Sequence, residues 1–154
     1  MHPTQKQLNQ WLRALGQSLN TELSLDADGS TCIACENDVQ VFVEMPDDSP
    51  LVCLYSPMIR LPDDLQAQNT LLKYALELNL FSLETGAACL ALDKRTQTLA
   101  LTFAVAFESL DAESFAEALG DFIELATDIS RRLTELDLRT SMSMQDLAHS
   151  TQMA

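Results

Sequence analysis

The sequence is poor in residues that interrupt regular structure and poor in positive charge. Only 4 of its 154 residues are glycine and 5 are proline, whereas 47% are hydrophobic. This composition argues against a disordered chain and indicates one ordered domain, since the length suits a single core. The 9 basic residues against 23 acidic ones give a net charge of −14. Phosphate backbones and anionic membranes would repel such a surface, so nucleic acid and lipid are unfavourable partners.

Motifs for catalysis and for nucleotide binding are also missing. The two histidines, His2 and His149, lie in the terminal segments, which we expect to be mobile, so a Ser/His/Asp or Cys/His arrangement is not favoured. Neither a GxGxxG nor a GxxxxGK[ST] phosphate-binding loop occurs. The run Asp26–Gly29 fits a turn better than the aspartate-rich loop of a calcium site. We therefore expect a protein that is not an enzyme and that uses no metal and no cofactor.

Four cysteines occur in strand-like runs of small and apolar residues: Cys32, Cys35, Cys53 and Cys89. The sequence has no membrane-spanning apolar run and opens on a helical pattern rather than a signal peptide, so we expect a cytosolic protein with reduced thiols. Cys32 and Cys35 form a CxxC pattern, but residues three apart on a strand point to opposite faces. Packed cysteines are the favoured interpretation, and a thiol enzyme or metal protein is the alternative.

The first half of the sequence predicts one helix and three strands. Apolar residues at helical spacing follow Thr4, which we expect to be the N-cap, and include Leu8, Trp11 and Leu15. The strands are predicted at Thr31–Cys35, Val39–Met45 and Leu51–Met58, separated by turn-forming residues. Their spacing indicates an antiparallel meander.

The second half predicts a helix, a strand pair and a long helix. The helix Leu65–Leu80 follows Asp63 as its N-cap and carries leucines around much of its circumference. The strands Ala88–Leu92 and Leu99–Phe107 form a hairpin, and the second of them alternates large apolar residues with alanine and threonine. Its large face is expected to enter the core, and its small face permits close approach by another element.

The last predicted helix begins at Asp111 and has the clearest pattern in the sequence. One side carries an apolar stripe from Phe115 to Leu136, and the opposite side carries glutamates and aspartates. After Leu138 the polar segment lacks periodicity, so we expect one domain at 1–138 and a mobile tail at 139–154. The order α-β-β-β-α-β-β-α predicts an α+β fold, an antiparallel sheet with flanking helices.

Four segments of the second half resemble the class I chaperones of bacterial type III secretion, the Tir-chaperone-like family. These segments are Leu71–Leu80, Thr85–Asp93, Leu99–Leu101 and Leu110–Leu119. The resemblance extends to the order of elements over about 135 residues, and the size and the acidity agree with it. It implies a cytoplasmic bacterial protein without catalytic activity or nucleotide.

The resemblance further implies a homodimer built through the second helix and the following strand. The residues expected at this interface are Leu72, Leu76, Leu80, Cys89, Leu90 and Leu92. Such a dimer binds the N-terminal region of a secreted effector in an extended, non-globular form and keeps it soluble for export. A regulatory adaptor of the same fold, which sequesters a transcription factor or a secretion component, is the alternative.

Residue chemistry is compatible with this mechanism, because apolar strands offer pockets and an exposed sheet edge can accept an added strand. We expect the binding grooves on the first helix and the first strands. The candidate residues are Trp11, Leu15, Ile33, Val41, Val43, Val52 and Leu54.

Overall fold

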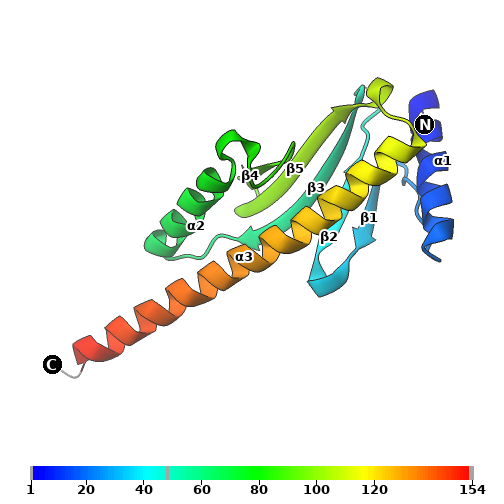
Figure 1. The fold of residues 1–154 in the computed structure, drawn as a ribbon. Coiled ribbons are helices and arrows are strands. Elements are labelled where there is room, and N and C mark those ends of the chain that lie inside the picture. Colours follow the sequence, from blue (N-terminus) through cyan, green and yellow to red (C-terminus); the bar gives the residue numbers. More distant parts are fainter. Residues whose placement is uncertain (1, 48, 153–154) are drawn as a thin grey trace.

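The computed structural model describes residues 2–47 and 49–152. Within them, the helices and strands follow the predicted order of an α+β domain (Figure 1). In chain order they are α1 (Pro3–Ser18), β1 (Ser30–Ala34), β2 (Gln40–Glu44), β3 (Leu51–Arg60), α2 (Leu65–Leu78), β4 (Cys89–Asp93), β5 (Thr98–Ala106) and α3 (Ala112–Gln152). Three short 3₁₀ helices join them: η1 (Glu36–Asp38), η2 (Leu80–Ser82) and η3 (Phe107–Ser109).

The five strands form one antiparallel sheet in the order β1-β2-β3-β5-β4, which confirms the predicted fold class. The longest pairing joins β3 to β5 and runs from Leu51 opposite Ala106 to Arg60 opposite Thr98. Because β1 and β4 each have only one neighbour, they are the edges of the sheet. Side chains alternate between its two faces, so each strand contributes one set to the core and one to the other face.

Helix α3 lies diagonally across one face of the sheet and contacts β3, α1 and α2 (Figure 1). Its predicted apolar stripe packs there: Leu119, Ile129 and Leu133 are at most 1% exposed. Burial of each such side chain contributes about 1.5–3 kcal/mol, which makes this contact the centre of the core. The face under α3 is therefore the buried face of the sheet.

Helix α1 closes one end of this core. Leu8 and Leu12 are fully buried, and the ring of Trp11 stacks on Phe107 with centroids 5.1 Å apart. The helix begins at Pro3 with His2 as N-cap, so the prediction of Thr4 as N-cap was wrong. Proline is favoured at the first helical position because it has no N–H to leave unpaired.

Helix α2 packs against α3 and β4. Its N-cap is Asp64, whose carboxylate accepts a hydrogen bond from the amide of Ala67, and not Asp63 as predicted. From α3, Arg132 donates hydrogen bonds to the hydroxyl of Tyr74 and to the carboxylate of Glu84, both at 3.0 Å. These bonds, led by the one to Tyr74, raise the pKa of the guanidinium above its usual value. Arg132 therefore ties α2 and the segment after it to α3.

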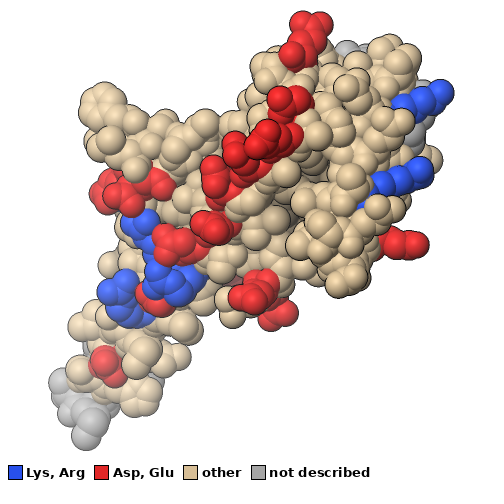
Figure 2. Space-filling model, turned by 45° about the vertical axis from the view of Figure 1, so that its right-hand side comes forward, with Lys and Arg blue, Asp and Glu red and all other residues tan. Residues whose placement is uncertain are grey.

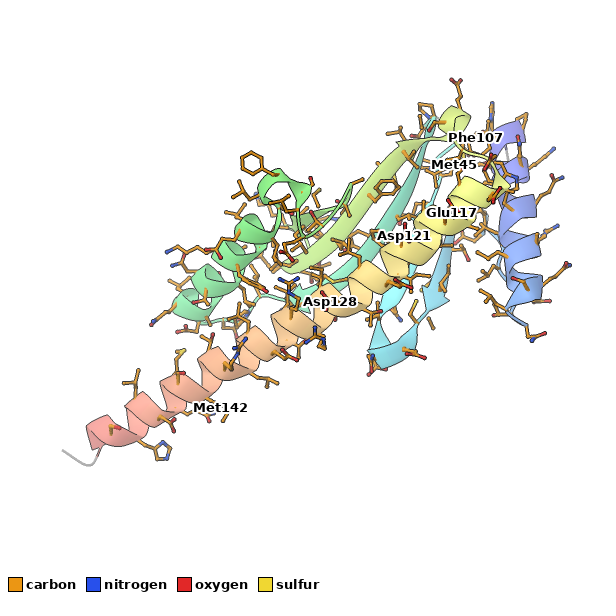
Figure 3. The ribbon with its side chains drawn as sticks, viewed as in Figure 1. Met45, Phe107, Glu117, Asp121, Asp128 and Met142 are labelled. Carbon is orange, nitrogen blue, oxygen red and sulfur yellow. The ribbon has the colours of Figure 1, made fainter. Side chains whose placement is uncertain are left out.

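Helix α3 continues far beyond the point where the sequence suggested that it ends. It extends to Gln152, and its C-terminal part, which includes Met142, projects away from the sheet (Figure 3). The sequence showed no apolar periodicity after Leu138, but residues 139–152 are helical, and Met153 and Ala154 lie outside the described residues. The boundary of the domain and the mobility of the projecting segment stay predictions. No helix in the described ranges has both the length and the apolar character needed to cross a membrane.

Candidate protein-binding surfaces

The seven residues expected to line binding grooves divide into two groups. Four of them lie in the core, at most 2% exposed, and are not accessible in this structure: Val41, Val43, Val52 and Leu54. The reason is register, since Val41, Val43, Val52 and Leu54 all point to the face that α3 covers. Trp11, Leu15 and Ile33 are half-buried at its border, and their contact with a partner stays a prediction.

The residues expected at a dimer interface are mostly on the surface. Leu76 is 70% exposed, Leu80 60% and Leu92 43%, and Cys89 is also exposed. Leu72 is half-buried, and Leu90 is only 7% exposed because it packs in the core. Leucines this accessible leave apolar surface of the monomer in contact with water, which is unfavourable. Burial of that surface against a partner would remove this free-energy cost.

Two further exposed apolar residues near these leucines were not predicted from the sequence. Phe81 in η2 and Leu83 after it are 83% and 80% exposed. Phe81 has a φ of 54°, in the left-handed region that bulky residues rarely adopt. We call Leu76, Leu80, Phe81, Leu83 and Leu92 the α2–β4 surface. A strained, exposed aromatic residue beside exposed leucines is typical of a contact site rather than of a solvated loop.

The outer edge of β4 is closed at Leu90 by the side chain of Asn79, the C-cap of α2. Asn79 donates from Nδ2 to the carbonyl oxygen of Leu90 at 2.9 Å, and its Oδ1 accepts from the Leu90 amide at 2.8 Å. One side chain thus satisfies both backbone groups that an added strand would use at this residue. Asn79 lies in the segment Leu71–Leu80, which carries part of the resemblance noted in the sequence, and linking α2 to β4 is its structural role.

The outer edge of β1 is different. The amides of Cys35 and Met45 donate to the carbonyls of Val39 and Gly29, so the odd-numbered residues of β1 face β2. In an antiparallel ladder the intervening residues then direct their amides and carbonyls outward. At Ser30 these groups bond to Asp26, but at Cys32 and Ala34 no hydrogen-bond partner on that side occurs among the described residues. The edge at Cys32 and Ala34 is therefore unpaired.

The face of the sheet opposite α3 is accessible along β1 and the C-terminal part of β5, although Ala100 on the same side of β5 is buried. Ala34, Ala104 and Ala106 are exposed on it, and the rings of Phe42 and Tyr55 lie 6.0 Å apart. This is the face of small residues that the sequence identified as suited to close approach, and in the protomer no such element covers these alanines.

A groove lies on the other face of the sheet, between α3 and the turn that joins β1 to β2. Its volume is about 710 Å³. Cys35 and Val39, which flank η1 in the turn, contribute to it, and Ile123, Thr127 and Thr134 contribute from α3. Four carboxylates stand around it, those of Glu36, Glu124, Asp128 and Glu135, together with the guanidinium of Arg131. An apolar floor and an anionic rim thus occur in one depression.

The two CxxC cysteines are free thiols in different environments. Cys32 is exposed on the open face, whereas Cys35 is half-buried. Burial, and secondarily the nearby Cys32 thiol, raises the pKa of Cys35, which reduces the thiolate that nucleophilic or metal chemistry needs. Among residues 2–47 and 49–152 no group of three or more histidine, cysteine or acidic side chains is placed to hold a metal ion.

Several solved structures share this fold. The ExsC–ExsE complex matches with a TM-score of 0.65 and 20% identity over 86% of this chain and 97% of that one. The HopA1–SchA chaperone–effector complex matches with a TM-score of 0.65 and 16% identity over 88% and 98%. The ExoU–SpcU complex of the Pseudomonas aeruginosa type III secretion system matches with a TM-score of 0.58 and 18% identity over 84% and 96%.

Among curated protein sequences, none matches this chain significantly. A family model, in contrast, matches residues 10–130, from α1 through most of the buried part of α3. This range includes the α2–β4 surface, the unpaired edge of β1 and most of the groove beside α3. The chain belongs to the Tir chaperone protein (CesT) family.

Proposed function

We propose that this protein is a chaperone of bacterial type III secretion, not an enzyme, and that it acts in the cytoplasm. It binds the N-terminal region of a secreted effector in an extended, non-globular form and keeps it soluble until export. The observation that carries the proposal is the family match over residues 10–130. Two of the similar structures, a chaperone–effector complex and a complex from a type III secretion system, support it.

The unpaired edge of β1 supplies a way to bind an extended chain. Main-chain hydrogen bonds at Cys32 and Ala34 would accept a strand whatever its side chains, and neighbouring pockets would then select among sequences. The edge of β4 is a poor alternative, because Asn79 already occupies the backbone groups of Leu90. We therefore assign strand addition to β1, beside the half-buried Ile33.

The functional unit in this proposal is a homodimer that buries the α2–β4 surface. Its exposed leucines and Phe81 are of the kind that form the centre of stable protein interfaces. The net charge of −14 keeps such a dimer soluble and disfavours assembly beyond it.

Co-expression with the products of neighbouring genes, followed by affinity capture, tests the function. We expect one exported polypeptide to co-purify with a dimer whose mass does not change on dilution to micromolar concentration. A DNA-binding protein as the only partner would favour the regulatory adaptor, and a strictly monomeric protein without partners would contradict both. Removing Cys32 and Cys35 together should leave capture unchanged, which distinguishes a chaperone from a thiol enzyme.

A further inference from the structure

The groove between α3 and the β1–β2 turn is suited to a particular kind of polypeptide. We infer that it binds an extended segment of the partner in which apolar side chains are flanked by arginine or lysine. The inference rests on the proposed chaperone function and adds the chemistry of the segment and the place where it binds. It follows from three features: the apolar floor, the charge of the rim and the position beside the unpaired edge.

The floor is apolar and has room for several side chains. Val39 is buried beneath it and Ile123 is half-buried along its side. Its volume of about 710 Å³ falls in the range of about 300–1,000 Å³ that is usual for pockets that enclose ligands. Side chains of leucine or phenylalanine size would displace water from this surface and gain the free energy of apolar burial.

The rim is anionic on both sides. Glu36 stands on the turn, and Glu124 stands on α3. Within the described part of the chain, the ion pairs at the groove are those of Arg131 with Asp128 at 2.6 Å and Glu135 at 3.0 Å, and that of Arg132 with Asp128 at 3.5 Å. Glu36 and Glu124 therefore keep uncompensated charge, and a basic residue on either side of an apolar one would meet a carboxylate.

The charge of α3 also decides whether a second copy of this chain or another protein is the favoured occupant of the groove. Figure 2 shows acidic side chains as a diagonal stripe along the outer side of α3, and Glu117, Asp121 and Asp128 lie on it in Figure 3. A second copy of this chain would bring a net charge of the same sign, so self-association through the groove is disfavoured. A cationic, partly apolar segment of another protein is the occupant that the charges favour.

Because the groove lies at the end of β1, we expect the bound segment of the partner to be extended. Cys35, which lines the groove, directly follows the last residue of β1. A segment that pairs with Cys32 and Ala34 would therefore continue into the groove without a turn. Every second side chain of such a strand faces the α3 side, which sets the spacing of the apolar residues.

The test uses three fluorescein-labelled dodecapeptides, which alternate leucine with arginine, leucine with glutamate, and serine with arginine. Fluorescence anisotropy measures their binding to the full chain at 0.15 M salt. We expect the leucine–arginine peptide to bind at least about tenfold more tightly than either of the others, because it alone supplies both apolar burial and charge pairing. Equal binding of the leucine–glutamate peptide would overturn the inference.

Two pairs of variants locate the binding site. Thr134→Trp fills the groove from an exposed position of α3, and Ser141→Trp places the same side chain on the same side of the helix seven residues further on. Glu36→Gln with Glu124→Gln removes two rim charges, and Glu113→Gln with Glu117→Gln removes two others from α3. Far-UV circular dichroism verifies that all four proteins fold.

Thr134→Trp should weaken binding of the leucine–arginine peptide at least tenfold, and Ser141→Trp should not. Loss of the rim charges should weaken it about fivefold, the factor expected for two exposed ion pairs. The control pair should change binding less than about twofold, because Glu117 lies about 10 Å along the axis from Glu124 and salt screens charge over about 8 Å. Equal effects within either pair would overturn the inference.

Effector capture by the Thr134→Trp protein and by the unchanged protein distinguishes failure of this inference from failure of the proposed function. If an effector co-purifies with the Thr134→Trp protein as well as with the unchanged protein, the groove is not its binding site, although the chaperone function stands. If no effector is captured by either protein, the proposed function itself fails.

Discussion

The link between Asn79 and Leu90 is expected to be among the most important polar contacts in the protein. Replacing Asn79 with alanine removes both hydrogen bonds, of 2.9 and 2.8 Å, and leaves an amide and a carbonyl without partners at a residue that is 7% exposed. Each bond contributes about 1 kcal/mol net, and buried groups left unpaired cost about 1–3 kcal/mol more, reduced here because water can reach a sheet edge. We expect the free energy of unfolding to fall by about 2–3 kcal/mol.

Urea unfolding followed by fluorescence measures this change, because the only tryptophan, Trp11, stacks on Phe107 and reports loss of the core. Protein concentration must be the same in every sample, since the stability of a dimer depends on it. A loss of about 2–3 kcal/mol corresponds to a melting temperature lower by about 5–10 °C in a chain of this size.

The matched control is Asn69→Ala, which changes the same residue type at an exposed position of the same helix. It should leave stability within about 0.5 kcal/mol, or raise it slightly, because alanine is the better helix former. If Asn79→Ala and Asn69→Ala unfold at the same urea concentration, Asn79 does not hold β4 to α2 and the reasoning on the closed edge is refuted.

Three further predictions test other parts of the structure. Leu76→Arg places charge in the α2–β4 surface and should convert a dimer to monomers in sedimentation velocity, and an unchanged dimer would exclude this surface. Gly16→Ala should destabilise by about 1–3 kcal/mol in thermal unfolding, because its Cβ would lie 2.6 Å from a backbone oxygen of the following loop, whereas Gly120→Ala meets nothing within 4 Å and should stabilise. Mass spectrometry after brief iodoacetamide treatment should find exposed Cys32 alkylated before Cys35. Burial raises the pKa of the Cys35 thiol, so its thiolate fraction and its rate increase only at higher pH, and faster reaction of Cys35 would contradict this.

Local periodicity was enough to predict the elements of this fold. The alternation from Leu99 to Phe107 identified β5 and its core side, on which Leu99 and Leu101 are at most 2% exposed. The apolar stripe of α3 is buried as predicted from Phe115 to Leu133. These patterns depend only on neighbouring residues along one element, and the geometry of a helix or strand fixes which of them share a face.

The same patterns could not identify the accessible apolar residues. Val41, Val43, Val52 and Leu54 form a suitable apolar surface, but only the docking of α3 decides that it is covered. In α2 the leucines surround the helix, and the sequence did not distinguish the buried Leu71 from the exposed Leu76. Which side of such a helix is covered depends on contacts distant in sequence, which a local pattern does not contain.

The C-terminal part of α3 was missed for a different physical reason. Its residues lack an apolar stripe, which is the main signal for a helix, but they also lack glycine and proline. Serine and threonine hydroxyls donate to carbonyls four residues earlier, as in Thr140 to Leu136, Ser143 to Arg139 and Ser150 to Asp146. These bonds satisfy side chains that otherwise compete with the helix, and a helix already nucleated over α3's buried part extends at little cost.

The two sheet edges together determine where an extended partner can enter. Asn79 occupies the outward backbone groups of Leu90 on β4, and Asp26 occupies those of Ser30 on β1, whereas those of Cys32 and Ala34 have no partner among the described residues. Those residues lead toward the groove and its anionic rim, where side-chain selection would follow the less selective main-chain pairing. In a symmetric homodimer this arrangement occurs twice, and the two edges are equivalent by rotation. A single long segment that engages both would bind far more tightly than either site alone, because the second contact is intramolecular.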